Sequence, residues 1–181
     1  MSRIISGVFS DHDRVLIDAA TIQSRISEMA GQINRDYAGQ EITLLAIMDG
    51  GLLFVADLMR QLELPVRLVT MSASSYHGST KSSGQVRLPW PEGLVLKGGN
   101  VLLLDDILDT GLTLGALQDR LQSEETASLR TGVLLKKRRE HARQVAVDYV
   151  GFEIEDEFVV GYGMDYQGRF RNLPCIGILR P

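Results

Sequence analysis

The segment from Val101 to Leu114 constrains the fold of this chain more than any other stretch. It reads VLLLDDILDTGLTL: four apolar residues, three aspartates, a Thr-Gly turn and then an apolar stretch at helical spacing. An apolar run of this length with a β-branched start is typical of a strand buried on both faces of a parallel sheet. The segment therefore predicts a strand that leads into a helix, with acidic side chains at the carboxyl end of the strand, where open α/β sheets bind ligands.

The rest of the chain alternates strand-like apolar runs with stretches at helical spacing. Strands are expected at 42–48, 66–71, 101–104 and 130–136, and helices at 51–62 and from residue 112 onward. An earlier helix is indicated by apolar residues at helical spacing, namely Val15, Ile22, Ile26, Met29 and Ile33. This alternation predicts an α/β fold with a mostly parallel central sheet flanked by helices. No repeat or low-complexity linker divides residues 1–181, so we expect a single domain.

The composition is that of a globular protein with one core, because 44% of the 181 residues are hydrophobic and 23% are charged. A formal net charge of −4 gives no general attraction to nucleic acid. One cysteine, Cys175, excludes an intrachain disulfide, and residues 1–14 lack the apolar core of a signal peptide. No stretch is apolar enough to span a membrane. We therefore expect a cytoplasmic protein that binds neither nucleic acid nor membrane.

The residue types of the aspartate segment suit a ligand that carries both hydroxyls and a phosphate. Asp105 and Asp106 can accept hydrogen bonds from sugar hydroxyls, while Thr110, Gly111 and Thr113 offer hydroxyl and backbone N–H donors to a phosphate at the start of a helix. A solvated turn with a helix cap is the simpler alternative. Three acids and two threonines exceed what capping needs, so we favour a site for a ribose 5-phosphate.

A second alternative is the Asp-Asp-x-x-Asp metal motif of isoprenoid-diphosphate enzymes, which residues 105–109 also match. That motif belongs on a helix of an all-α protein. Here an apolar strand precedes the aspartates and a glycine follows two residues after the last one, which disfavours this alternative.

Several separated segments carry a family resemblance: MDGG at 48–51, SSY at 74–76, the aspartate segment, LLKK at 134–137, and FVVGYGMDY at 158–166 followed by FR at 170–171. In this order they resemble the type I phosphoribosyltransferases, and more narrowly their 6-oxopurine branch, the hypoxanthine-guanine phosphoribosyltransferases. The resemblance implies the type I phosphoribosyltransferase fold, in which a small hood formed by N- and C-terminal segments accompanies the central sheet.

The resemblance also implies a reaction, the transfer of the 5-phosphoribosyl group from phosphoribosyl diphosphate to N9 of hypoxanthine or guanine, with Mg²⁺. Asp109 would take the proton from purine N7 as the general base. Asp105 and Asp106 would hold the ribose hydroxyls directly or through the metal, and the Thr/Gly loop after them would bind the 5-phosphate.

Further assignments follow from the resemblance for the second half of the chain. Lys137 would donate to the purine 6-oxo group, Phe158 would stack on the ring, and the backbone of Val159 would read the ring edge. Asp165 would be a metal ligand and Arg171 a pyrophosphate contact. From the residues alone, Lys137 could belong to a solvated basic cluster and Phe158 to the core.

Two further groups of residues carry no chemistry in this interpretation. Arg138 and Arg139 are expected to be solvated members of the basic cluster at 136–139. The histidines His12, His77 and His141 have no metal-ligand spacing and no triad partner.

The Ser/Gly-rich stretch at 72–85 is expected to be a long mobile loop, with an ordinary surface linker as the alternative. By resemblance this loop closes over the site and excludes water, and Ser75 and Tyr76 contact the pyrophosphate region.

The MDGG segment is expected to be a strand-to-helix turn whose glycines let the backbone approach an anion. By resemblance it is the pyrophosphate loop, with a cis peptide between Met48 and Asp49. Family members commonly carry Lys or Arg where this chain has Asp49. Either the backbone of Gly50 and Gly51 binds the pyrophosphate, or Asp49 points away from it.

A regulator that senses phosphoribosyl diphosphate is the alternative from another functional class, because such regulators use the same fold. The presence of Asp109 and the lack of a helix-turn-helix extension or a strongly basic surface favour the enzyme. By resemblance we also expect a homo-oligomer, either a dimer or a tetramer.

Overall fold

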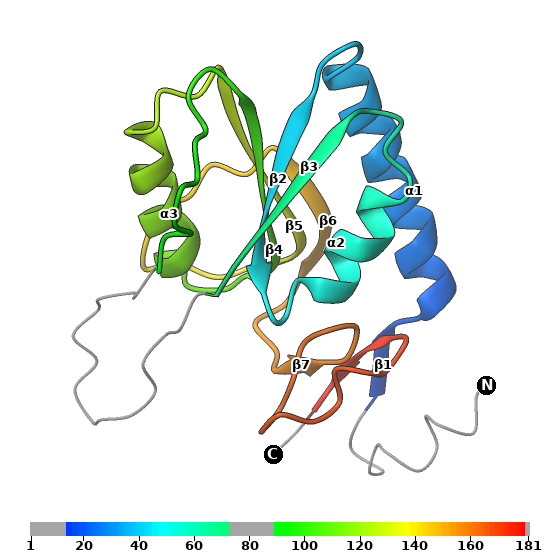
Figure 1. The fold of residues 1–181 in the computed structure, drawn as a ribbon. Coiled ribbons are helices and arrows are strands. Elements are labelled where there is room, and N and C mark those ends of the chain that lie inside the picture. The colour runs from blue at the N-terminus through cyan, green and yellow to red at the C-terminus, as the bar shows by residue number, and fades with distance from the viewer. Residues whose placement is uncertain (1–13, 73–88, 180–181) are drawn as a thin grey trace.

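The computed structural model describes residues 14–72 and 89–179, and its centre is a five-stranded parallel sheet (Figure 1). The strands lie in the order β3-β2-β4-β5-β6. Their bounds are β2 (Ile42–Met48), β3 (Val66–Ser72), β4 (Asn100–Leu108), β5 (Ser128–Lys137) and β6 (Tyr149–Ile154). The predicted α/β class with a parallel central sheet is confirmed.

The strand order contains one reversal of direction. From β2 the chain crosses to β3 on one side, and it then returns to place β4 on the other side of β2. In open α/β sheets, ligands bind outside the carboxyl ends of the strands at such a reversal. The topology therefore directs attention to the loops that follow β2 and β4.

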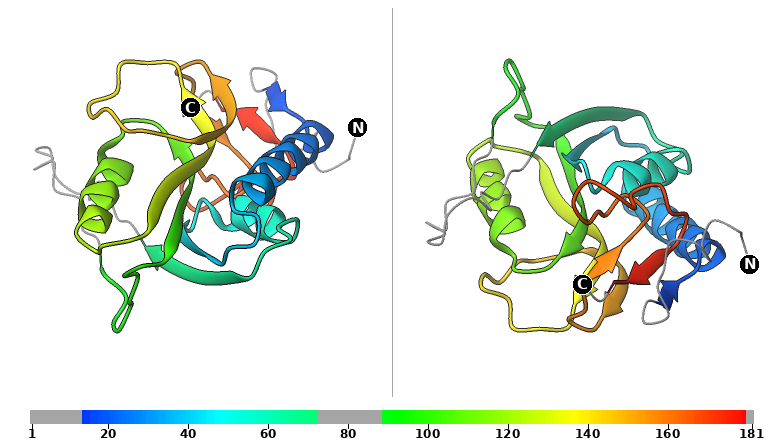
Figure 2. Two further views of the ribbon diagram at one scale, coloured as in Figure 1. Left: turned by 90° about the horizontal axis from the view of Figure 1, so that it is seen from above. Right: turned by 90° about the horizontal axis from the view of Figure 1, so that it is seen from below.

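Helices cover both faces of the sheet, as the two views of Figure 2 show. One face packs against α1 (Ala19–Asp36) and α2 (Leu52–Met59), and the other against α3 (Leu112–Gln122). Successive side chains of a strand point to opposite faces, so Leu102 joins the first core and Leu103 the second. Burial on both faces is the physical reason for the uninterrupted apolar runs in the sequence.

The first helix begins later than its apolar spacing predicts. Asp18 caps α1, and its carboxylate accepts a hydrogen bond from the backbone N–H of Thr21 at 2.8 Å. The expected apolar stripe of α1 is fully buried, but Val15 was wrongly included in it. Val15 lies in β1 (Arg14–Ile17) and pairs with Gly177.

A small antiparallel sheet forms the predicted hood from both ends of the chain. Its strands are β1, β7 (Val159–Val160) and β8 (Ile176–Ile178), in the order β1-β8-β7. In Figure 1 the hood lies below the large sheet, next to the end at which β2 turns into α2. No helix in the described part of the chain is long and apolar enough to cross a membrane.

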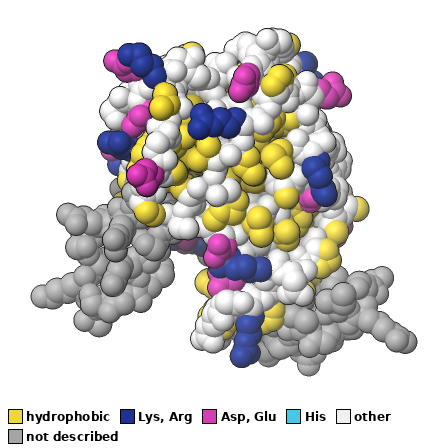
Figure 3. Space-filling model, in the orientation of Figure 1, with side chains coloured by type: hydrophobic (Ala, Val, Ile, Leu, Met, Phe, Trp, Pro, Cys, Tyr) yellow, Lys and Arg dark blue, Asp and Glu magenta, His cyan; other side chains and the backbone are white. Residues whose placement is uncertain are grey.

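Apolar side chains are exposed over β3 and α2, where yellow atoms gather in Figure 3. Leu68 on β3 is 43% exposed, and Leu52 at the start of α2 is 52% exposed. Within the described residues β3 pairs only with β2, so its other side is a free strand edge.

Candidate active site

The aspartate pair lies inside the last residues of β4, because this strand continues to Leu108 rather than ending at residue 104 as expected. Asp105 is buried, and its Oδ1 accepts the backbone N–H of Asp106 at 2.9 Å. Burial, together with the neighbouring Asp106 charge, raises the pKa of Asp105 well above its usual range. Burial also raises the pKa of Asp106, although hydrogen bonds and the Arg171 charge oppose this effect. This pair, with Asp105 buried and Asp106 partly buried, suits a ligand that brings positive charge or hydroxyl donors.

The loop after β2 lies directly against this pair. A Cβ atom added to Gly50 would fall 1.8 Å from Oδ2 of Asp106, so a larger residue here would displace the Asp106 carboxylate. Arg171, from a third segment, lies close enough to Asp106 to lower the pKa of its carboxyl group by its charge. The three segments were predicted to share a site, and the structure brings them together.

The peptide between Met48 and Asp49 is cis, as predicted. The Asp49 side chain is exposed, and it forms no ion pair with any residue of 14–72 or 89–179. Gly51 allows the backbone to turn, because a Cβ at this residue would lie 2.6 Å from the carbonyl oxygen of Ile47. The loop thus presents backbone groups at the end of β2 while the acidic side chain faces solvent.

The predicted phosphate loop leads from β4 into α3. Gly111 precedes the helix with a left-handed φ of 81°, and a Cβ there would lie 2.1 Å from the carbonyl oxygen of Arg143. Thr110 Oγ1 lies 3.4 Å from the backbone nitrogen of Leu112, and Thr113 is the second residue of the helix. Gly111 has no side chain to cap the first turn, so the N–H groups after that of Leu112 remain available to an anion.

A charge cluster of Asp109, Lys137, Arg139 and Asp156 lies beyond the ends of β4 and β5. The Lys137 ammonium is 3.3 Å from Oδ2 of Asp109 and 3.2 Å from Oδ1 of Asp156. Arg139 Nη1 lies 3.1 Å from Oδ1 of Asp109 and 3.2 Å from Oδ2 of Asp156. The Lys137 side chain is only 10% exposed, so these carboxylates, rather than water, are its main polar partners.

Sequence reasoning missed part of this cluster. Arg139 is exposed, as expected of a solvated basic residue, but it also pairs with Asp109 and Asp156, which the sequence did not indicate. Asp156 was not singled out, because nothing in the stretch EDE at 155–157 distinguishes it. His141, to which no chemistry was assigned, donates from Nδ1 to the backbone carbonyl of Asp109 at 2.6 Å. It therefore helps to hold the backbone at Asp109.

Aromatic and charged residues of the hood region complete the site. Phe158 is 44% exposed, which disfavours the alternative that it is a core residue. Its ring meets Tyr166 edge to face, with centroids 5.6 Å apart. Val159 is buried in β7 and pairs with Ile178. Asp165 forms an ion pair of 2.8 Å with Arg171, so two predicted site residues contact each other.

Ser75 and Tyr76 lie outside the described residues, as does nearly all of the loop expected at 72–85. Their predicted contact with pyrophosphate therefore stays a prediction.

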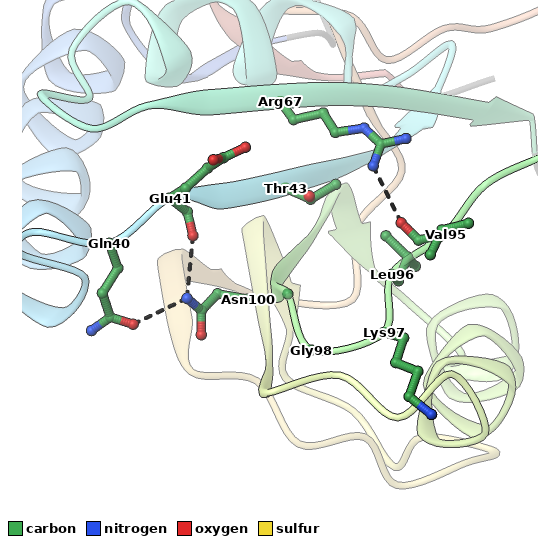
Figure 4. A pocket seen from close by; sticks show the side chains of 10 residues that line it. Gln40, Glu41, Thr43, Arg67, Val95, Leu96, Lys97, Gly98 and Asn100 are labelled. Carbon is green, nitrogen blue, oxygen red and sulfur yellow. Dashed lines mark hydrogen bonds between the residues drawn. The ribbon is translucent and has the colours of Figure 1, made fainter.

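A hollow of about 510 Å³ lies at the opposite, amino-terminal end of the strands (Figure 4). Some of the polar groups that line it already have partners. Arg67 donates to the carbonyl oxygen of Val95 at 3.2 Å, and Asn100 Nδ2 donates to Gln40 Oε1 at 3.0 Å. The predicted site residues lie at the other end of the sheet, so the hollow is separate from them.

Comparison with known proteins identifies the family. The family model described as phosphoribosyl transferase domain matches residues 17–167. A hypoxanthine-guanine phosphoribosyltransferase of Staphylococcus aureus is 38% identical over 172 residues, which cover 95% of this chain and 96% of the relative. One from Mycobacterium tuberculosis is 42% identical over 177 residues, covering 94% and 88%. The chain belongs to the hypoxanthine-guanine phosphoribosyltransferase family.

Solved structures of this phosphoribosyltransferase family have the same fold. A hypoxanthine phosphoribosyltransferase from Staphylococcus aureus superposes with a TM-score of 0.90 at 36% identity, covering all of this chain and 97% of the other. A hypoxanthine phosphoribosyltransferase from Trypanosoma cruzi, solved as a ternary substrates complex, gives a TM-score of 0.85 at 38% identity, covering 92% and 95%. The predicted type I phosphoribosyltransferase fold with its hood is confirmed.

The phosphoribosyltransferase site offers oxygen donors to a divalent cation. Among the described residues, no three acidic, His or Cys side chains converge to hold an ion by themselves. The adjacent carboxyl groups of Asp105 and Asp106, whose pKa values are raised by burial, nevertheless fit Mg²⁺, which binds through one or two carboxylates and takes its other ligands from water and substrate phosphates.

Proposed function

We propose that this chain transfers the 5-phosphoribosyl group from phosphoribosyl diphosphate to N9 of hypoxanthine or guanine in purine salvage. The products are IMP or GMP and pyrophosphate. The observation that carries the proposal is the position of the nearly buried Lys137 ammonium, 3.3 Å from Asp109 and beyond the same ends of β4 and β5 as the aspartate pair and the phosphate loop. The carboxyl ends of these strands thus carry groups for the purine, the ribose and the phosphate.

The ribose 5-phosphate would lie along the end of β4. The N–H groups and hydroxyls from Thr110 to Thr113 bind the 5-phosphate, and Asp105 and Asp106 hold the ribose hydroxyls. The reaction passes through a sugar with cationic character, which nearby carboxylates stabilise.

Mg²⁺ would be held by the aspartate pair together with Asp165, and its charge would stabilise the departing diphosphate. Asp165 forms an ion pair with Arg171, so an acidic metal ligand and a cation for the leaving group would lie side by side. The backbone of Gly50 and Gly51 would donate to the pyrophosphate, and Arg171 would pair with it. Ser75 and Tyr76 would complete this end of the site when their loop closes.

The purine would lie between the charge cluster and Phe158. Lys137 donates to the 6-oxo group, and Phe158 stacks on the ring while the backbone of Val159 reads its edge. Adenine is excluded because its 6-amino group gives the ammonium no acceptor. Asp109 accepts the N7 proton as N9 attacks the sugar, a transfer that needs only a carboxylate within hydrogen-bond reach.

The function is tested by incubating the protein with Mg²⁺, phosphoribosyl diphosphate and one purine at a time, and separating the nucleotides by chromatography. We expect IMP from hypoxanthine, GMP from guanine and no AMP from adenine. A protein that binds phosphoribosyl diphosphate but forms no nucleotide from any base would instead be the regulator. Omitting Mg²⁺ from a parallel reaction tests the metal, and an unchanged rate would contradict its assignment.

We also propose that this single-domain protein works in the cytoplasm as a homo-oligomer, either a dimer or a tetramer. Exposed Leu68 on the free edge of β3 and exposed Leu52 on α2 support an apolar contact between copies. The one cysteine, Cys175, is a buried free thiol, as suits a reducing compartment. Sedimentation of the Leu68→Lys variant tests the contact, and an oligomer as stable as that of the parent protein would place the contact elsewhere.

A further inference from the structure

The hydroxyl of Tyr162 joins two distant parts of the chain. Tyr162 is 4% exposed, and its Oη donates to Oδ2 of Asp57 on α2 at 2.5 Å. Gln23 of α1 donates to the same oxygen at 2.6 Å, and Arg60 forms an ion pair with the other carboxylate oxygen. Three side chains, from α1, from the end of α2 and from the hood region, therefore meet at the Asp57 carboxylate.

The backbone at Tyr162 is held in an unusual conformation. Its φ is +49°, and Gly161 and Gly163 on either side have φ values of +96° and +98°. A left-handed conformation is unfavourable for a residue with a Cβ and has to be maintained by surrounding contacts. We call residues 161–163 the glycine–tyrosine turn, and the bond to Asp57 is one of the contacts that maintain it.

The glycine–tyrosine turn touches both groups proposed for the diphosphate. Gly163 donates its N–H to the carbonyl oxygen of Arg171 at 3.0 Å, and Arg171 Nη1 donates to the carbonyl oxygen of Gly163 at 2.6 Å. A Cβ on Gly163 would lie 2.1 Å from the carbonyl oxygen of Gly50. A shift of this turn would therefore move Arg171 and the loop after β2 together.

Asp57 is a strong anchor for the turn. Burial disfavours its carboxylate, but the hydrogen bonds from Tyr162 and Gln23 and the Arg60 charge outweigh this effect and lower the pKa of Asp57. The group is therefore ionised at neutral pH, and hydrogen bonds to an ionised acceptor are stronger than those between neutral groups. Asp57 also lies on α2, the helix that begins directly after Gly51.

We propose that the Tyr162–Asp57 hydrogen bond positions Arg171 and the loop after β2 for the diphosphate of phosphoribosyl diphosphate. Tyr162 is thus a positioning residue that acts through the glycine–tyrosine turn. The inference rests on the proposed function, because it takes this end of the site to be the diphosphate end.

The chain offers a matched control for the loss of this hydroxyl. Tyr149 is equally buried, and its Oη donates to Oδ2 of Asp36 at 2.6 Å. Tyr149 begins β6 and Asp36 ends α1, so this pair lies at the amino-terminal end of the sheet, away from the site. The same deletion of one oxygen can therefore be made near the site and far from it.

The experiment compares Tyr162→Phe and Tyr149→Phe with the parent enzyme. For each we measure kcat, the KM values for phosphoribosyl diphosphate and hypoxanthine, the Kd for GMP, which carries no pyrophosphate, and the thermal midpoint. Tyr162→Phe is expected to raise the KM for phosphoribosyl diphosphate about tenfold, as loss of a hydrogen bond to a charged group permits, with the other two ligand constants changed less than about twofold. Tyr149→Phe is expected to lower the thermal midpoint alone.

Equal KM changes in the two variants, or a lower thermal midpoint without any KM change in Tyr162→Phe, would overturn the proposal. If Tyr162→Phe does not fold, Asp57→Asn serves instead, because it keeps the shape of the side chain but removes the charge that strengthens the bond, and it must raise the same KM. The Arg171→Gln variant distinguishes failure of the proposed diphosphate site from failure of the positioning role of Tyr162. An unchanged KM for phosphoribosyl diphosphate in that variant refutes the diphosphate site itself, whereas a raised KM with no effect of Tyr162→Phe refutes only the positioning.

Discussion

Replacing Lys137 with alanine should weaken purine binding while sparing phosphoribosyl diphosphate. The Lys137 side chain is 10% exposed, so little water can replace the ammonium as a donor to the 6-oxo oxygen. Loss of a buried hydrogen bond to a charged group costs about 1.5–3 kcal/mol, which corresponds to a rise of about 10- to 150-fold in the purine Kd. The carboxylates of Asp109 and Asp156 keep Arg139 as a shared cation in this variant, so the loss is expected to fall on the purine contact.

The neighbouring lysine provides the control for this measurement. Lys136 is 37% exposed and contacts Glu153 at 3.6 Å on the outside of the site. Exposed pairs of this kind contribute at most about 1 kcal/mol, so Lys136→Ala should leave both Kd values nearly unchanged. Isothermal titration with guanine and with phosphoribosyl diphosphate gives the two constants separately. Equal losses for the two ligands, or equal effects of the two lysines, would refute the assignment of Lys137.

Three other substitutions test neighbouring parts of the site. Asp109→Asn should lower kcat by about 10²- to 10⁴-fold while phosphoribosyl diphosphate still binds, because the amide keeps the shape but cannot accept the N7 proton; near-normal turnover would remove Asp109 from the mechanism. Asp156→Asn should raise the KM for hypoxanthine, because Lys137 loses one of the carboxylates that hold its ammonium in place. Glu155→Gln changes a side chain that is 72% exposed and should leave this KM unchanged. Equal KM values in the two variants would contradict a role of Asp156 in holding Lys137. Asp49→Lys should lower the KM for phosphoribosyl diphosphate at low salt, with a gain that fades as salt is added because the side chain is exposed; a gain independent of salt would mean direct contact with the diphosphate.

Local sequence patterns predicted correctly those strands and helices that are buried to the same degree along their whole length. The strand at 42–48 has its predicted bounds because every residue before Met48 is buried, so the apolar run and the strand coincide. Val15 was assigned to the wrong element because periodicity cannot detect that the chain turns at Asp18. The strand through Asp105 and Asp106 is longer than its apolar run because polar residues can continue a strand that is still paired with its neighbour.

The incomplete prediction of the charge cluster has a different cause. Lys137 pairs with Ile154 across the parallel strands β5 and β6, so residues two positions beyond each strand lie close together. This register brings Arg139 and Asp156 together although they are 17 positions apart in the printed sequence. Strand register is set by contacts between distant segments, and no local motif encodes it.

The reversal between β2 and β4 has a mechanical consequence for the bound substrate. The loop after β2 leads into α2 on one face of the sheet, and the loop after β4 leads into α3 on the other face. A substrate bound by its diphosphate at the first loop and by its 5-phosphate at the second would connect the helical layers on the two faces of the sheet. If either helical layer separated from the sheet, these contacts with the substrate would be lost. The substrate would therefore bind only the native state and raise the temperature at which the protein unfolds.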